Sequence, residues 1–251
     1  MRTDNLIING YGSSNGGEFH KVQLNGKGTV NGNVECEQFE CNGYGAVTGD
    51  LKSSSARISG SGKVDGTVHA ETMRIDGKAT ITQNVKANSL KIAGKGTIGG
   101  NVTGEEFKVN GQATIDGNCE VDTFSSEGQF TIGGLLSADE ININIHGTCR
   151  AKEIGGQTIK VRHRSGTFSR LFKTVFGLQL EAELLEGDNI DIDYAHIRTV
   201  RGNNVTVGAN CEIELIEYTG VLTVDKNANV KKLSRFNGRE KSIWNIHIVS
   251  Q

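Results

Sequence analysis

The sequence predicts an all-β protein, a parallel β-helix whose triangular coils each contain about 17 residues. Seven consecutive blocks of equal length run without a gap from Val22 to Glu140 and share one pattern. Within each block, apolar and polar residues alternate over short runs, which is the period of a strand rather than of a helix. A fixed period of this kind is typical of a solenoid, in which each coil buries its apolar side against its neighbours. It favours a rod over an enzyme with a pocket.

Three positions in each block are almost always aliphatic, and we expect them to form three buried columns. The columns occupy the third, ninth and thirteenth positions, with the members Leu24, Cys41, Ile58, Ile75, Ile92, Val109 and Ser126; Val30, Val47, Val64, Ile81, Ile98, Ile115 and Ile132; and Val34, Leu51, Val68, Val85, Val102, Cys119 and Leu136.

Corners between these columns follow from turn residues and from parity. Turn dipeptides such as Asn25-Gly26 and Asn31-Gly32 recur at two places in the block. They predict corners, because Gly accepts the positive φ of a tight turn and the Asn side chain supports the turn. Strand alternation has a period of two, but the block has 17 residues, so the alternation must break at one further place in each block. Polar pairs such as Ser54-Ser55 mark that place, where we expect a third corner. Seven coils stacked at about 4.8 Å would span roughly 34 Å. Parallel crossovers favour a right-handed coil, although aliphatics at hexapeptide spacing also suit left-handed prisms.

Composition and motifs exclude most other classes of protein. The net charge of -2 over 251 residues gives no overall basic field for nucleic acid. No stretch has the length of a membrane-spanning helix, and the N-terminus lacks the pattern of a signal peptide, so we expect a cytoplasmic protein. Close cysteine pairs are absent, which favours buried free thiols over metal ligands. No catalytic or cofactor-binding motif is found, and we expect no cofactor and no metal. His69 is expected to face solvent.

Past residue 140 the pattern becomes irregular. Ile141, Ile143 and Ile145 begin another coil, and a strand follows at residues 159–161. Residues 162–178 then break the strand pattern with an amphipathic helical stripe, which has basic residues beside it. The stripe and its cations are Phe168, Leu171, Phe172, Val175, Phe176, Arg170 and Lys173. This insert is expected either to cover a flank of the solenoid or to contact a membrane or a partner.

Coils resume after the insert with unequal steps, from Ile190 to Val205 and from Val205 to Leu222. Four acidic residues of these coils, which could form a strip on one outer face, are Asp191, Asp193, Glu212 and Glu214. Alternation predicts that they point to water rather than forming a glycoside-cleaving pair. The end cap or subunit contact is expected at Leu6 and Ile8 of a partial first coil, and at Trp244, Ile246 and Ile248 of a last strand.

These observations divide the chain into three parts: a regular β-helix with a partial first coil at 1–161, the amphipathic insert at 162–178, and less regular coils with a C-terminal strand at 179–251.

The repeats resemble those of the bactofilins, a bacterial family of polymer-forming cytoskeletal proteins. Three segments are similar to the longer Gram-positive members: the N-terminal stretch LIINGYGSSNGGEFHKVQLNGKGTVNGNVECEQFECNG, the segment KEIGGQTIKV and the run VRGNNVTVGANCEIELIEY. The resemblance implies a right-handed β-helix that assembles into filaments without a nucleotide, often at the membrane. This chain differs by its second run of coils, its insert and its lack of Pro-rich tails.

We therefore expect a structural scaffold, not an enzyme, whose main partner is itself. Each end of a parallel β-helix leaves backbone groups unpaired, and end-to-end stacking would satisfy them. Further partners are the inner membrane surface and other envelope or scaffold proteins, and no nucleic acid. Two alternatives remain open: a left-handed hexapeptide acyltransferase, and a carbohydrate-active β-helix.

Overall fold

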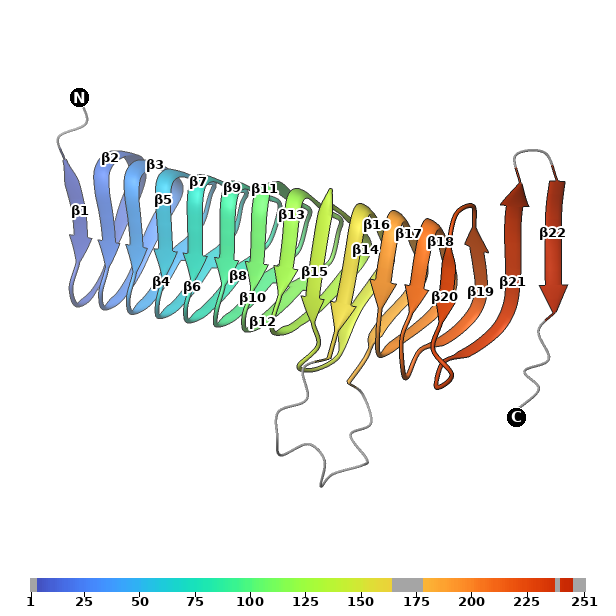
Figure 1. Ribbon diagram of the computed structural model, residues 1–251. Coiled ribbons are helices and arrows are strands. Elements are labelled where there is room, and N and C mark those ends of the chain that lie inside the picture. The colour runs from blue at the N-terminus through green and yellow to red at the C-terminus, as the bar shows by residue number, and fades with distance from the viewer. Residues whose placement is uncertain (1–3, 164–177, 238–239, 246–251) are drawn as a thin grey trace, which may run out of the picture. The chain divides into compact units, whose positions relative to one another are not determined.

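The chain folds as a parallel β-solenoid of about 13 turns with about 17 residues per turn, as the sequence predicted (Figure 1). The computed structural model describes residues 4–163, 178–237 and 240–245. Those residues contain strands and no helix. The helix expected at Phe168–Phe176 lies outside them. The hand of the coil stays a prediction.

Two compact units make up the chain, the first covering residues 1–123 and 131–133 and the second the remainder. The first unit holds β1 (Asn5–Ile8), β2 (Tyr11–Leu24), β3 (Lys27–Cys41), β4 (Tyr44–Val47), β5 (Leu51–Ile58), β6 (Ser61–Val64), β7 (Val68–Ile75), β8 (Lys78–Ile81), β9 (Val85–Ile92), β10 (Lys95–Ile98), β11 (Val102–Val109) and β12 (Gln112–Ile115). Residues of β13 (Cys119–Ser126) and β14 (Gln129–Ser137) fall in both units.

The second unit holds β15 (Glu140–Asn144), β16 (Cys149–Arg162), β17 (Leu180–Ile192), β18 (Ala195–Val207), β19 (Glu212–Tyr218), β20 (Leu222–Val224), β21 (Asn229–Asn237) and β22 (Glu240–Asn245).

Each regular coil of the first unit has three sides, with the third corner predicted from the odd length of the block. A short strand such as β6 forms one side, and a longer strand such as β5 bends to form the other two. The bend falls at the predicted place, because the register between β5 and β7 passes from Ser53 to Ser55 and skips Ser54. Burial along β5 breaks its alternation at the same point.

All three predicted columns are buried, including the polar Ser126 at the end of one of them. From β3 onward the coils of the first unit repeat in a constant register, with Leu51 opposite Val68 and Val68 opposite Val85. Such in-register stacking places like residues above one another at about 4.8 Å. At one corner this produces an asparagine ladder, in which Asn25 donates to Asn9 at 2.8 Å and Asn42 donates to Asn25 at 2.9 Å.

The second unit confirms the irregular steps read from the sequence. Ile190 pairs with Val205, and Val205 pairs with Leu222, in parallel register. The strand predicted at residues 159–161 lies in β16 and pairs with the Ile141–Ile143 part of β15. The last strand differs from all the others described, because β22 pairs antiparallel with β21.

Candidate assembly surfaces

The N-terminal end of the first unit is an open strand edge. Within the described residues, β1 pairs only with β2, in parallel, so its other edge has no neighbouring strand. Leu6 lies opposite Val22 and Ile8 opposite Leu24. Val22 and Leu24 are fully buried, whereas Leu6 and Ile8 are only half-buried. The apolar core therefore reaches the surface at the residues that the sequence singled out.

Polar residues replace the aliphatic columns over the rest of this end. Ser14 lies opposite Val30, and Gly17 lies opposite Val34 after a register shift. Gly17 has a φ of 151°, which L side chains rarely adopt. The first coil therefore has smaller residues than its neighbour at these column positions, and its exposed outer residues include Ile7 (49%) and Tyr11 (85%).

The C-terminal end is built differently. β21 pairs with β19 in parallel and with β22 in antiparallel, and Trp244 of β22 lies opposite Leu233. An antiparallel strand cannot continue a parallel coil, so β22 ends the winding on that side. Residues 246 and 248, where Ile246 and Ile248 were expected to join Trp244, lie outside the described residues. So do Phe168, Arg170, Leu171, Phe172, Lys173, Val175 and Phe176 of the insert.

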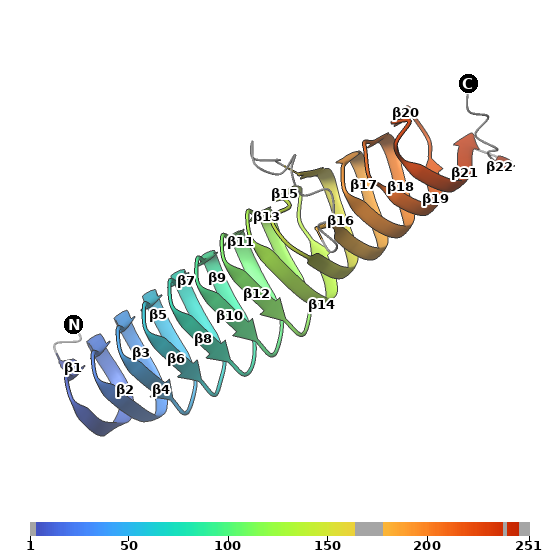
Figure 2. The same ribbon diagram turned by 90° about the horizontal axis from the view of Figure 1, so that it is seen from below.

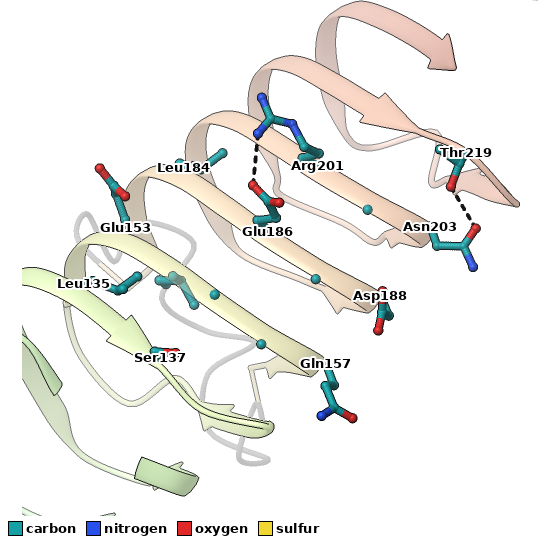
Figure 3. A pocket seen from close by; sticks show the side chains of 15 residues that line it. Leu135, Ser137, Glu153, Gln157, Leu184, Glu186, Asp188, Arg201, Asn203 and Thr219 are labelled. Atoms are coloured by element: carbon teal, nitrogen blue, oxygen red, sulfur yellow. Dashed lines mark hydrogen bonds and ion pairs between the residues drawn. The ribbon is translucent and has the colours of Figure 1, made fainter. Parts of the chain in front are cut away.

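A polar groove of about 590 Å³ crosses the second unit, and the sequence did not predict it (Figure 3). Its floor is a glycine ladder in which Gly156 pairs with Gly187, and Gly187 with Gly202. A Cβ at Gly187 would lie 2.5 Å from the carbonyl oxygen of Gly156, so the ladder brings backbones close together. The Gly-Gly pair of KEIGGQTIKV was its only signal in the sequence.

Arg201 binds carboxylates on both of its neighbouring turns in this groove. Its guanidinium lies 3.0 Å from Glu186 and 2.9 Å from the buried Glu217. The hydrogen bond to Glu217 is the main cause that raises the pKa of Arg201 above its ordinary value. Figure 3 shows Glu186 and Arg201 pointing toward each other. The pair neutralises a carboxylate that is costly to bury alone.

Other chemically capable residues are dispersed. No group of three or more His, Cys, Asp or Glu residues in the described part of the chain could hold a metal ion. All five cysteines are free and buried, and burial raises the pKa of the Cys119 and Cys149 thiols to about 12. The prediction that cysteines serve packing is confirmed. His69 is exposed, also as predicted.

The four acidic residues do not form one strip, because Asp191 lies opposite Thr206 whereas Glu212 lies opposite His196, in another column of the coil. Glu212 and Glu214 are exposed, and Glu214 lies 3.5 Å from Lys231. Asp191 and Asp193 are half-buried and both pair with Arg162. The last two carboxylates are thus engaged in ion pairs across the turns of the solenoid.

Comparison with known proteins identifies the family. The bactofilin family model, described as polymer-forming cytoskeletal, matches residues 1–82 and again residues 43–120. The chain belongs to the bactofilin family. Its function is accordingly that of a polymer-forming cytoskeletal protein, in a family that is structural and self-associating.

Two relatives come from Bacillus subtilis strain 168. The uncharacterized protein YhbE is 61% identical over 229 residues, which cover 91% of this chain and 96% of the relative. The uncharacterized protein YhbF is 32% identical over 102 residues, or 40% of this chain and 41% of the relative. No solved structure shows a significant similarity to the chain. Within the described residues, no helix is long and apolar enough to cross a bilayer.

Proposed function

We propose that this bactofilin is a scaffold subunit that self-assembles end to end, without a nucleotide and without a catalytic step. The open edge of β1 carries the proposal. Leu6 and Ile8 are half-buried there, while the core residues beneath them are fully buried. A second subunit on this edge would bury the remaining apolar surface, at about 25 cal/mol per Å². It would also pair the backbone groups that an edge strand leaves open.

Electron microscopy and sedimentation in nucleotide-free buffer test this proposal. Wild-type protein is expected to form filaments, and the double variant Leu6→Arg/Ile8→Arg is expected to sediment as small species. Ile7→Arg is the matched control, because Ile7 lies on the same strand but alternates to the outer face. It should leave assembly unchanged.

Circular dichroism must show that all the variants keep their strand content. Filaments of normal length in the Leu6→Arg/Ile8→Arg variant would contradict the proposed contact. Monodisperse wild-type protein at high concentration, in every salt tried, would contradict self-assembly itself.

The proposed location is the cytoplasm, with the polymer peripheral on the inner face of the membrane. Beyond its own copies, the proposed partners are envelope or scaffold proteins. The insert at 162–178, with its apolar stripe and its basic residues, is the proposed membrane or partner contact. That assignment rests on the sequence pattern.

Neither alternative function is favoured by an observation. A hexapeptide acyltransferase is built from coils of three hexapeptides, whereas each coil of the first unit, as from Leu51 to Val68 to Val85, is shorter than that. A carbohydrate-cleaving β-helix requires a free carboxylate pair, whereas Asp191 and Asp193 share Arg162 and Glu214 pairs with Lys231.

A further inference from the structure

One side of the first unit carries lysines and no carboxylate. We call it the lysine face, and it consists of Tyr11–Ser14 of β2, Lys27–Val30 of β3, and strands β4, β6, β8, β10 and β12. Figure 2 shows β4, β6, β8, β10 and β12 side by side along the first unit. These segments contain Lys27, Lys63, Lys78 and Lys95 and no Asp or Glu. The chain's net charge of -2 conceals this local excess.

The outward side chains of the lysine face form an ordered array, because its strands pair in register. One column runs through Tyr11, Lys27, Tyr44, Ser61, Lys78, Lys95 and Gln112. Beside it lies a second outward column, which runs through Lys63, Thr80, Thr97 and Thr114. Neighbouring strands lie about 4.8 Å apart, so the cations project from one sheet at short, regular intervals.

Two of these cations have no anionic partner. Lys78 and Lys95 are exposed, and neither has an ion pair with any described residue. Lys63 pairs with Asp65 at the corner, and Lys27 lies over the Tyr11 ring at 5.5 Å. Unpaired charges of one sign on a flat face create a positive surface potential that attracts anions.

The same column exposes two tyrosines to an unusual extent. Tyr11 is 85% exposed and Tyr44 is 70% exposed, and they flank Lys27. Tyrosine and lysine together are the residues enriched where a protein meets the headgroup region of a bilayer. Burying these rings at such a boundary would remove apolar surface from water while their hydroxyls stay hydrated.

Another side of the same unit has the opposite character. The acidic residues there, on the first halves of the long strands and at the following corner, are Glu35, Glu37, Glu71, Glu105, Glu120 and Asp122. Lys52 and Lys86 are the lysines on that side. The third side, on the second halves of the long strands, carries Arg57, Arg74, Lys91 and Lys108, and the two arginines pair with Asp76. An anionic plane would therefore repel the acidic side, and the exposed tyrosines distinguish the lysine face from the third side.

We propose that the lysine face docks on an anionic lipid surface and that polymerisation makes this docking tight. The inference rests on the proposed function, in which the protein is a polymer at the membrane. Each lysine near an anionic membrane contributes about fivefold in affinity, so one subunit binds weakly. A filament presents many copies of the face at once, and its avidity exceeds that of one subunit by orders of magnitude.

Vesicle co-sedimentation tests the proposal with the full chain and vesicles of phosphatidylcholine containing about one third phosphatidylglycerol. The variant Lys78→Gln/Lys95→Gln is expected to bind at least about 25-fold more weakly, because the factor of about fivefold per lysine applies to each subunit and a filament multiplies it. Lys52→Gln/Lys86→Gln is the matched control. It removes two exposed lysines from the acidic side with the same change in net charge, and its binding should stay within about twofold of wild type. Vesicles of phosphatidylcholine alone should bind none of the proteins.

Filament formation is measured in parallel without vesicles, so that the two proposals fail separately. Normal filaments with reduced vesicle binding in the Lys78→Gln/Lys95→Gln variant support the docking face. Equal losses for both lysine pairs would overturn it, since only net charge would then matter. Unchanged vesicle binding by this variant would also overturn the proposal. If lateral filament bundles were lost instead, the face would be a contact between copies. If binding to a DNA oligonucleotide were lost instead, the face would be a nucleic-acid contact.

Discussion

At the residue scale, the corners of the coil depend on glycines that have no room for a side chain. A Cβ added at Gly77 would lie 2.0 Å from the carbonyl oxygen of Gly60 and 2.4 Å from that of Ser59. Gly60 and Gly94 have the same relation to the preceding turn. Successive coils therefore touch backbone to backbone at this corner, and a methyl group there would force the turns apart.

Gly77→Ala is expected to lower the free energy of unfolding by about 3 kcal/mol, the upper range for overpacking a tightly packed site. Gly10→Ala is the control, since a Cβ at Gly10 meets nothing within 4 Å. Urea titration followed by circular dichroism compares the two. Equal midpoints would show that the corner yields more easily than its geometry indicates.

At the element scale, β22 is the strand that changes direction. Because it runs antiparallel to β21, its pairing closes one edge of the second unit. An uncovered edge would expose unpaired backbone groups, which recruit strands from other molecules. Among the described residues β22 has no neighbour on its far side, so the C-terminal end offers the β1 edge of a second subunit the antiparallel β22 instead of the parallel β21.

Removing residues 238–251 is expected to increase association, because the edge of β21 then becomes available. Analytical ultracentrifugation would show a shift toward larger species at equal concentration. Removing residues 246–251 alone keeps β22 and is the control that should behave as wild type. A truncated chain no larger than this control would contradict the capping role.

Sequence reasoning succeeded for these elements where one residue type repeats at one spacing. The columns of Val30, Leu51 and Ile58 were readable because strand alternation and a constant period agree. The direction of β22 was not readable, since alternation is the same in parallel and antiparallel strands. The groove over Gly156, Gly187 and Gly202 depends on two register steps of unequal length, which no fixed period predicts.

At the scale of the whole molecule, membrane attachment has two candidate origins, the lysine face and the insert. Replacing residues 164–177 by a Gly-Ser linker of equal length separates them. If the insert is an anchor, vesicle binding should fall by about tenfold or more while filaments persist, since apolar and basic contacts are both lost. Unchanged co-sedimentation would leave the lysine face as the surface to be tested and end the anchor hypothesis.

The constant register from β3 to β12 also means that the length of the subunit can change by whole turns. Leu51, Val68 and Val85 occupy equivalent places in successive turns, so a gain or loss of one such repeat unit by recombination leaves every remaining neighbour relation unchanged. Related proteins could thus differ in the length of this unit by steps of about 4.8 Å per turn, with no change to the residues at either end.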